Sequence, residues 1–369
     1  MINNVTNSSP IDDELSKRIR SLRFILMVFI VFIHNEILKG NITINFSDSS
    51  VVIESPLLCQ IIQSLANSIT HIAVPFFFLI SGFLQYTKEP KFMPNLKKKS
   101  RTILLPHILW TILLLILFYT TQSIDFTRQY FHTYIIREFS LMDWLGAFTG
   151  HFGKFMQEDE HLTHTPLVYQ FWFLRDLFVL NLLYVGIRKL IDWRPATTLV
   201  FLVLWWISGV DIHILNPSAT LFFSLGYYIV KYRLSYKSLD KIKNSNMVII
   251  YAISILANFT FEHLAFRLIN IVAGIMFFWK LSYNFVKSKN IYNVLAWLEK
   301  YSFWLYASHG LIMNIIIKVS IKILPMNTAW IPLLHYFILT PFIILALVAV
   351  GIVIKKAFPK IFFVLTGGR

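Results

Sequence analysis

Long apolar runs, separated by short polar segments, follow one another along almost the whole chain. A helix needs about 20 apolar residues to cross the hydrocarbon core of a bilayer. The pattern therefore predicts ten membrane helices, over residues 21–38, 69–87, 102–122, 170–188, 196–212, 214–231, 246–262, 267–286, 296–317 and 332–354. We expect an all-α, polytopic integral membrane protein with about ten transmembrane helices.

A polar segment at the N-terminus sets the expected domain limits. Residues 1–20 are polar and predict a short N-terminal tail, whereas residues 21–369 show no internal repeat and no second soluble domain. We expect 21–369 to form a single membrane domain. Within it, Asn216-Pro217 is typical of a turn and predicts the start of the helix over 214–231.

Composition supports this class of protein. The chain is 56% hydrophobic and 14% charged, with a mean hydropathy of +0.61, whereas a soluble protein carries about 25% charged residues. A globule of this size would lack the charge to cover its surface. The single cysteine, Cys59, excludes an internal disulfide and a cysteine-rich metal site.

The net charge of +15 has two interpretations. A basic protein can bind nucleic acid, but in a membrane protein Lys and Arg concentrate in the cytoplasmic loops. With the N-terminus inside, 24 of the 34 Lys and Arg residues fall in inner segments and seven in outer ones. This distribution favours orientation over nucleic-acid binding, and it predicts that both termini are cytoplasmic.

Two long outer loops are expected, over 39–68 and 123–169. In the second, the stretch FTRQYFHTYIIREF (126–139) has the spacing of an amphipathic helix lying on the membrane surface. This loop also holds acidic residues and four histidines that lack the spacing of metal ligands: His132, His151, His161 and His164.

The first predicted membrane helix carries two ionisable side chains on one face. Arg23 and His34 are eleven steps apart, so the helix returns to within about 20° of its starting direction over a rise of about 16 Å. Ionisable groups within a membrane are costly and mostly functional. Arg23 as an interfacial anchor, and His34 as a hydrogen-bonded interior histidine, are the alternatives.

A second intramembrane histidine lies near the end of the chain. In YSFWLYASHG, the spacing of Ser302, Tyr306 and His309 places all three on one helix face. A shared polar cavity with His34 is one interpretation, and hydrogen bonding between helices is the other.

The adjacent charges Arg175-Asp176 lie at a membrane edge, where we expect them to pair locally or across helices.

Two further motifs have both a functional and an ordinary interpretation. The basic run from Lys97 to Arg101 suits a phosphate-rich cytosolic ligand, but such runs also set topology and contact anionic lipids. Ser81-Gly82 brings a hydroxyl next to a bare backbone, which is also common in helix packing. No Walker, GxSxG, HExxH or Rossmann motif is present.

Taken together, these segments resemble the acyltransferase-3 family of membrane acyltransferases. The motifs that carry the resemblance cover most of the chain: Arg23 with ten residues to His34, VPFFFLISGFL at 74–84, KKKSRTILLP at 97–106, FWFL at 171–174 and YSFWLYASHG at 301–310. The resemblance implies ten spans, an acyl-coenzyme A donor from the cytosol, and transfer of the acyl group, usually acetyl, to a carbohydrate hydroxyl.

The resemblance also implies roles for particular residues. His34 matches the family's essential histidine and Arg23 its paired arginine, while Lys98 and Arg101 match a basic pair before the proline, although arginine is frequent at the position of Lys98. Ser81 and Gly82 match the family's Ser-Gly pair. Members often carry a polar residue or histidine before Trp-Phe-Leu, where this chain has Gln170 and Phe171, to which we carry over no role.

These features lead us to expect an O-acyltransferase of the bacterial inner membrane that modifies a cell-envelope glycan or its lipid-linked precursor. Coenzyme A phosphates would bind near Arg23, Lys98 and Arg101, with Ser81 and Gly82 also at the donor site. His34 would act as base or carry the acyl group, and Ser302, Tyr306 or His309 would donate to the oxyanion. No metal is expected.

Other functions stay open at this point. A transporter or flippase of glycans or lipids without chemistry would also carry buried polar residues and basic inner loops. A structural partner in envelope synthesis would be insensitive to the loss of His34. The acyl group could be succinyl or another short chain instead of acetyl, and a separate envelope-synthesis protein could complete the reaction.

Overall fold

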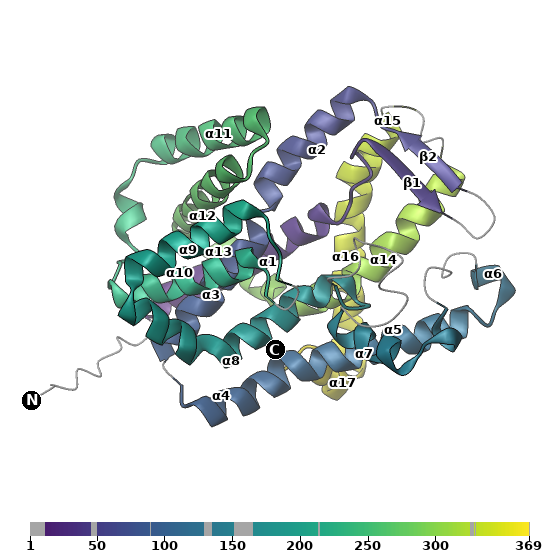
Figure 1. The fold of residues 1–369 in the computed structure, drawn as a ribbon. Helices are drawn as coiled ribbons and strands as arrows, with labels where there is room; N and C mark the ends of the chain where they lie inside the picture. Colours follow the sequence, from purple (N-terminus) through teal and green to yellow (C-terminus); the bar gives the residue numbers. More distant parts are fainter. Residues whose placement is uncertain are drawn as a thin grey trace, which may run out of the picture. The chain divides into compact units, whose positions relative to one another are not determined.

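The computed structural model describes residues 12–45, 50–88, 90–128, 135–150, 165–212, 215–324, 328 and 330–368. Their contacts divide into two compact units, whose helices and strands are labelled in Figure 1. The first unit comprises 12–26, 71–98 and 179–300, and the second comprises 27–70, 99–178 and 301–368 within the described ranges. Helices dominate both units, as the hydropathy pattern predicts.

Seven helical stretches in the described part of the chain are long and apolar enough to cross a membrane. They match seven of the ten predicted spans and comprise α2 (Leu57–Thr70) with α3 (Ala73–Lys88); α4 (Phe92–Lys99), the π-helix η1 (Ser100–Leu104) and α5 (Leu105–Thr121); η4 (Tyr169–Phe171) with α8 (Trp172–Trp193); α11 (Asn244–Phe261); α12 (Leu264–Lys287); α14 (Ser302–Ile323); and α15 (Trp330–Leu334), the π-helix η6 (His335–Leu339) and α16 (Thr340–Ala357). The protein is an integral membrane protein.

The other three predicted spans coincide with α1 (Asp13–Ile33), α9 (Pro195–Ser208) and α10 (Pro217–Lys231). α9 and α10 have only 14 and 15 residues, and α1 opens with a charged turn, so none meets the length and composition of a span. The Asn216 side chain caps α10 by accepting from the Ser218 and Ala219 amides, which confirms the predicted turn. Ten transmembrane helices and cytoplasmic termini stay predictions.

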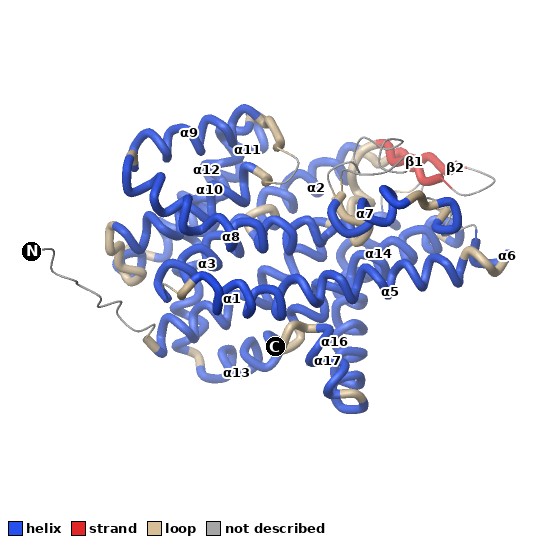
Figure 2. Tube along the Cα trace, turned by 60° about the horizontal axis from the view of Figure 1, so that its bottom comes forward, coloured by secondary structure: helices blue, strands red, loops and turns tan. Residues whose placement is uncertain are grey.

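Several predicted boundaries are wrong. α1 begins eight residues before the expected start and ends at Ile33 instead of residue 38. The span expected over 296–317 is divided between α13 (Lys289–Glu299) and α14. The expected loop over 39–68 contains α2 and an antiparallel hairpin of β1 (Asn41–Asn45) and β2 (Ser50–Glu54), drawn in red in Figure 2. The hairpin sequences NITIN and SVVIE are rich in β-branched residues, which favour strands.

Short helices form the described parts of the predicted loop 123–169. Its described parts form α6 (Asp125–Arg128), η2 (Ile136–Glu138) and α7 (Leu141–Thr149). The middle of the predicted amphipathic stretch and the four loop histidines lie outside the described residues. α7 begins with a capping box, in which Ser140 and Asp143 bind each other's backbone amides.

In the first unit, α3 and α10 approach so closely that only glycine fits at two positions. A Cβ added to Gly82 would lie 2.0 Å from the Phe223 carbonyl oxygen, and one added to Gly226 would lie 2.3 Å from the Phe83 amide nitrogen. Small residues let membrane helices pack backbone to backbone. Gly82 therefore has a packing role in this fold.

A buried arginine connects the start of α1 to the segment η5 (Ser238–Lys241) of the same unit. The Arg18 side chain is fully buried and donates to the carboxylates of Glu14 and Asp240. Burial disfavours the ionised form of Glu14, but hydrogen bonds from Arg18 and Lys237 outweigh it and hold the pKa of that carboxyl below its usual range. The polar start of α1 is thus an anchored part of the fold.

In the second unit, the last helices pack around Trp304. Its indole nitrogen donates to the Leu347 carbonyl of α16 at 3.0 Å, and a Cβ at Gly351 would lie 2.7 Å from its ring. α17 (Pro359–Leu365) packs against α5, where Trp110 donates to the Leu365 carbonyl. These contacts hold α14, which carries the polar stripe predicted from the sequence.

We predict that Gly82→Ala destabilises the protein by about 1–3 kcal/mol, because the added methyl group forces two backbones apart. Gly186→Ala is the matched control, since Gly186 lies in α8 of the same unit with open space around its Cβ position. That change should be neutral or stabilising by up to about 1 kcal/mol. The thermal unfolding midpoint in detergent measures both, and equal midpoints for the two variants would contradict the packing role.

Candidate active site

His34 lies in the second unit, one residue beyond the end of α1, between two aromatic side chains. Its ring centroid is 4.8 Å from that of Tyr169 with planes at 79°, and 5.2 Å from that of His309 with planes at 30°. His34 directly follows α1, whereas Tyr169 lies in η4 and His309 in α14, so the three residues are far apart in the sequence. The structure therefore brings together the two intramembrane histidines that the sequence singles out.

The hydrogen bond of His309 decides which of its nitrogens can react. Nδ1 lies 3.1 Å from the Leu305 carbonyl oxygen, which can only accept, so Nδ1 carries the proton. In the neutral ring, Nε2 then presents a lone pair. This atom is buried and has no hydrogen-bond partner within the described ranges. His309 is thus suited to accept a proton, and the expected role as an oxyanion donor does not fit its neutral form.

Tyr306 holds the segment that carries Tyr169. Its hydroxyl donates to the Gln170 carbonyl at 2.6 Å, and the Gln170 amide donates in return to the Ala307 carbonyl at 3.2 Å. The Gln170 amide occupies the space beside Gly310, where an added Cβ would lie 2.5 Å from Oε1. The Tyr306 hydroxyl is thus donated to the Gln170 carbonyl, and its expected role as an oxyanion donor stays a prediction.

The remaining residue of the predicted stripe, Ser302, is the first residue of α14. Ser302 is seven residues before His309, which is about 10 Å along the helix axis. The Ser302 hydroxyl is buried and has no hydrogen-bond partner in the described ranges. The three side chains therefore differ in their hydrogen bonding: Tyr306 donates to Gln170, His309 bonds within its own helix, and Ser302 has no partner in the described ranges.

Arg175 and Asp176 pair locally, which is one of the two arrangements expected from the sequence. Arg175 Nε donates to Asp176 Oδ1 at 3.0 Å, and the Asp176 side chain is fully buried. Arg175 also donates to the Thr149 carbonyl at the end of α7. The pair therefore connects the start of α8 to α7, which belongs to the same unit.

The predicted donor-site residues are distributed over both units. In the first unit, Arg23 Nη1 donates to Glu299 Oε1 at 2.7 Å, and Lys98 is exposed on α4. In the second unit, Arg101 is exposed on the π-helix η1. The Arg23 guanidinium is thus held by a carboxylate, which the sequence analysis did not anticipate. Cofactor binding by Ser81 and Gly82 also stays a prediction, next to the packing role of Gly82.

Sequence reasoning missed four residues of the second unit near His34: Tyr169, Gln170, Asn35 and His335. Asn35 is fully buried and donates to Thr340 Oγ1, with His335 Nδ1 also within reach. Each of the four is a polar or aromatic residue within a largely apolar stretch, which was the available signal. Across the parts of the chain that are described, no group of three or more His, Cys, Asp or Glu side chains could hold a metal ion.

We predict that Tyr306→Phe lowers the stability by about 0.5–1.5 kcal/mol, because the buried Gln170 carbonyl loses its donor. Tyr232→Phe is the control, since the Tyr232 side chain is half exposed and stacks on Tyr228 through its ring. The control should leave the thermal midpoint unchanged. Equal losses in the two variants would show that the Tyr306 hydroxyl contributes nothing specific.

Comparisons with known proteins identify the family. The family model described as "Acyltransferase domain" matches residues 17–353. The chain is also 26% identical over 374 residues to the succinoglycan biosynthesis protein ExoH of Rhizobium meliloti (strain 1021), covering 97% of this chain and 94% of that protein. No solved structure matches the chain. The matched region contains the motifs from Arg23 to His309, and the chain belongs to the acyltransferase-3 family of membrane acyltransferases.

Proposed function

We propose that this protein is a membrane O-acyltransferase that moves an acetyl or other short acyl group from acyl-coenzyme A to a hydroxyl of a cell-envelope glycan or lipid-linked sugar. The arrangement of His34 between Tyr169 and His309 carries the proposal. The family and the polysaccharide named in the relative's title support it. The location would be a bacterial inner membrane, with both termini in the cytoplasm, as the charge distribution predicts.

The reaction needs one proton acceptor and one acyl transfer. In the direct route, the acceptor oxygen attacks the thioester carbonyl carbon, the C–S bond breaks, and the hydroxyl proton moves to His34 while coenzyme A leaves as thiolate. In the relayed route, His34 attacks the carbonyl, releases the thiolate, and then passes the acyl group from its ring nitrogen to the acceptor oxygen. Both routes end with an O-acyl ester and free coenzyme A.

The neighbours of His34 are suited to either route. Because His309 Nε2 presents a lone pair, it can take the acceptor proton in the relayed route while His34 holds the acyl group. The Tyr169 ring edge restricts the orientation of the His34 imidazole. The apolar surroundings would also limit hydrolysis of the thioester by water.

The donor would enter from the cytosolic side near the basic residues. Arg101 and Lys98 are exposed and three positions apart, at the junction of α4 and η1. Guanidinium and ammonium groups suit the phosphates of coenzyme A. Arg23 would provide a further cation for the coenzyme A phosphates, with Glu299 fixing its guanidinium. The outer loop 123–169 would help to choose the acceptor.

We expect His34→Ala to reduce acyl transfer by at least about a hundredfold, which is the scale of losing a base or nucleophile. The measurement is mass spectrometry of envelope glycans from cells with wild-type or variant protein, which reads an added acetyl or succinyl mass. His263→Ala is the control, because His263 caps α12 in the first unit and lies outside this cluster. Full acylation by a folded His34→Ala protein would contradict the proposal.

A second experiment, with purified protein, separates an enzyme from a transporter. Purified protein is incubated with acetyl-coenzyme A or succinyl-coenzyme A and a soluble sugar acceptor, and the released thiol is measured. An enzyme releases thiol in proportion to the ester that is formed. A transporter or a structural partner would release none, whatever the glycan composition of the cells.

We predict that Lys98→Ala and Arg101→Ala each raise the KM for acyl-coenzyme A by about tenfold and leave kcat within about twofold, because they remove a phosphate contact that is the same in the ground and transition states. Lys243→Ala is the control, as an exposed lysine in another predicted cytosolic segment. An unchanged KM in both variants would mean that the donor binds elsewhere.

A further inference from the structure

The residue after His34 is held more firmly than a helix end requires. Asn35 is fully buried, and its backbone amide donates to the Phe32 carbonyl at 3.2 Å. Its side-chain Nδ2 donates to Thr340 Oγ1 at 2.7 Å and lies 3.3 Å from His335 Nδ1. Both partners belong to another helix of the same unit, and both are buried.

The π-helix η6 brings these two partners to one amide. His335 and Thr340 are five residues apart, so in an α-helix their directions would differ by about 140°. A π-helical turn closes an i to i+5 bond and brings such residues onto the same side. The π-turn of residues 335–340 therefore presents an imidazole nitrogen and a hydroxyl to the two hydrogens of Asn35 Nδ2. π-helical turns of this kind occur frequently at functional sites.

The hydrogen bonds fix the orientation of every group in this cluster. The Ile37 amide donates to Asn35 Oδ1 at 3.4 Å, which leaves Nδ2 facing the π-turn. Since Nδ2 is a donor, His335 Nδ1 must accept, and the His335 proton then lies on Nε2. Asn35 is thus bound through both atoms of its amide.

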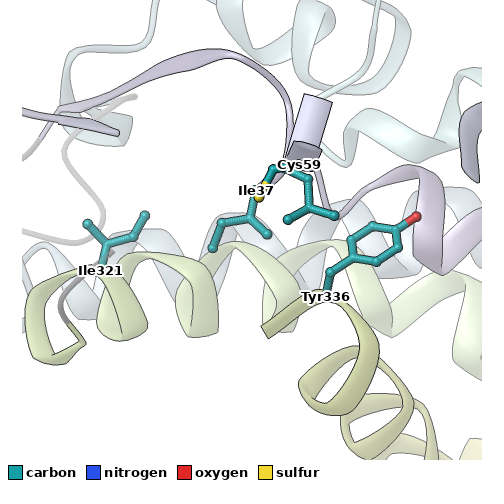
Figure 3. Close-up of a cluster of buried hydrophobic side chains, with 5 residues drawn as sticks. Ile37, Cys59, Ile321 and Tyr336 are labelled. Atoms are coloured by element: carbon teal, nitrogen blue, oxygen red, sulfur yellow. The ribbon is translucent and has the colours of Figure 1, made fainter. Parts of the chain in front are cut away.

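Apolar packing holds the same turn from both sides. The Tyr336 ring meets the Phe32 ring edge at a centroid distance of 5.3 Å, just before His34. After His34, Ile37 and Leu38 are buried in a cluster with Tyr336 and Cys59 (Figure 3). The π-turn thus contacts the chain before His34, directly after it at Asn35, and again at Ile37 and Leu38.

We propose that Asn35 is a positioning residue for His34, held by the π-turn through Thr340 and His335. This inference rests on the proposed function, because it assigns a role relative to a reactive His34. α1 ends at Ile33, and Asn35 is bound by its backbone and its side chain directly after His34. These bonds would set the direction in which the imidazole leaves the chain toward His309 and Tyr169.

The test uses the loss and recovery of a single hydroxyl. Thr340→Val keeps the shape but removes the acceptor of Asn35, and a misplaced reactive group costs on the order of a hundredfold in rate. We expect kcat for acyl transfer to fall by about ten- to a hundredfold, with the KM values of donor and acceptor unchanged. Thr340→Ser, which keeps the hydroxyl, should recover the wild-type kcat.

Thr111→Val is the matched control, because Thr111 is also fully buried in the second unit but donates only within its own helix, to the His107 carbonyl. Its kcat should stay at the wild-type value. A wild-type kcat for Thr340→Val, or equal losses in both valine variants, would overturn the proposal. Activity of His34→Ala would instead overturn the proposed function itself, so the two failures are distinguishable.

A second pair of variants covers the case in which Thr340→Val does not fold. His335→Leu removes the other acceptor, whereas His335→Asn keeps an oxygen close to the position of Nδ1. We expect the leucine variant to lose kcat and the asparagine variant to retain it. Equal kcat values in these two variants would overturn the role of the π-turn.

Discussion

The hydrocarbon core of a bilayer offers no hydrogen-bond partners, so each polar group in the apolar helices must be satisfied within the protein. This constraint explains why Asn35, Gln170 and Arg175 all bind groups of other segments in their unit. Two of these side chains lie where regular α-helix stops, Asn35 after Ile33 and Gln170 in η4, and the partners of Asn35 lie at η6. Irregular backbone at membrane depth is tolerated only where protein surrounds it.

Several buried side-chain atoms in both units escape this rule, and two of them belong to histidines described above. His309 Nε2 and His335 Nε2 have no hydrogen-bond partner in the described ranges. A buried polar atom without a partner costs about 1–3 kcal/mol. His309 Nε2 is distinguished from the others because its ring contacts His34, where the proposed reaction needs a proton acceptor.

The membrane-spanning pattern could be predicted from the sequence, because hydrophobic length is a property of consecutive residues. The start of α10 was also predictable, since Asn216-Pro217 acts locally. The end of α1 was not: the predicted span continued over the polar residues His34, Asn35 and Glu36 to Leu38, whereas the helix ends at Ile33 and the Asn35 side chain binds the π-turn of 335–340. The partners of Asn35 lie some 300 positions away in the sequence.

By itself, the sequence determined that the protein is a helical membrane protein and that His34 and His309 are its unusual residues, because an imidazole in an apolar run stands out in one dimension. Only the tertiary structure decided which residues surround His34, which nitrogen of His309 is available, and that Arg23 is paired with Glu299. Tyr169, Gln170 and His335 become site residues only through packing between segments. A hydrogen-bond partner is chosen by distance in space, which spacing along one chain does not specify.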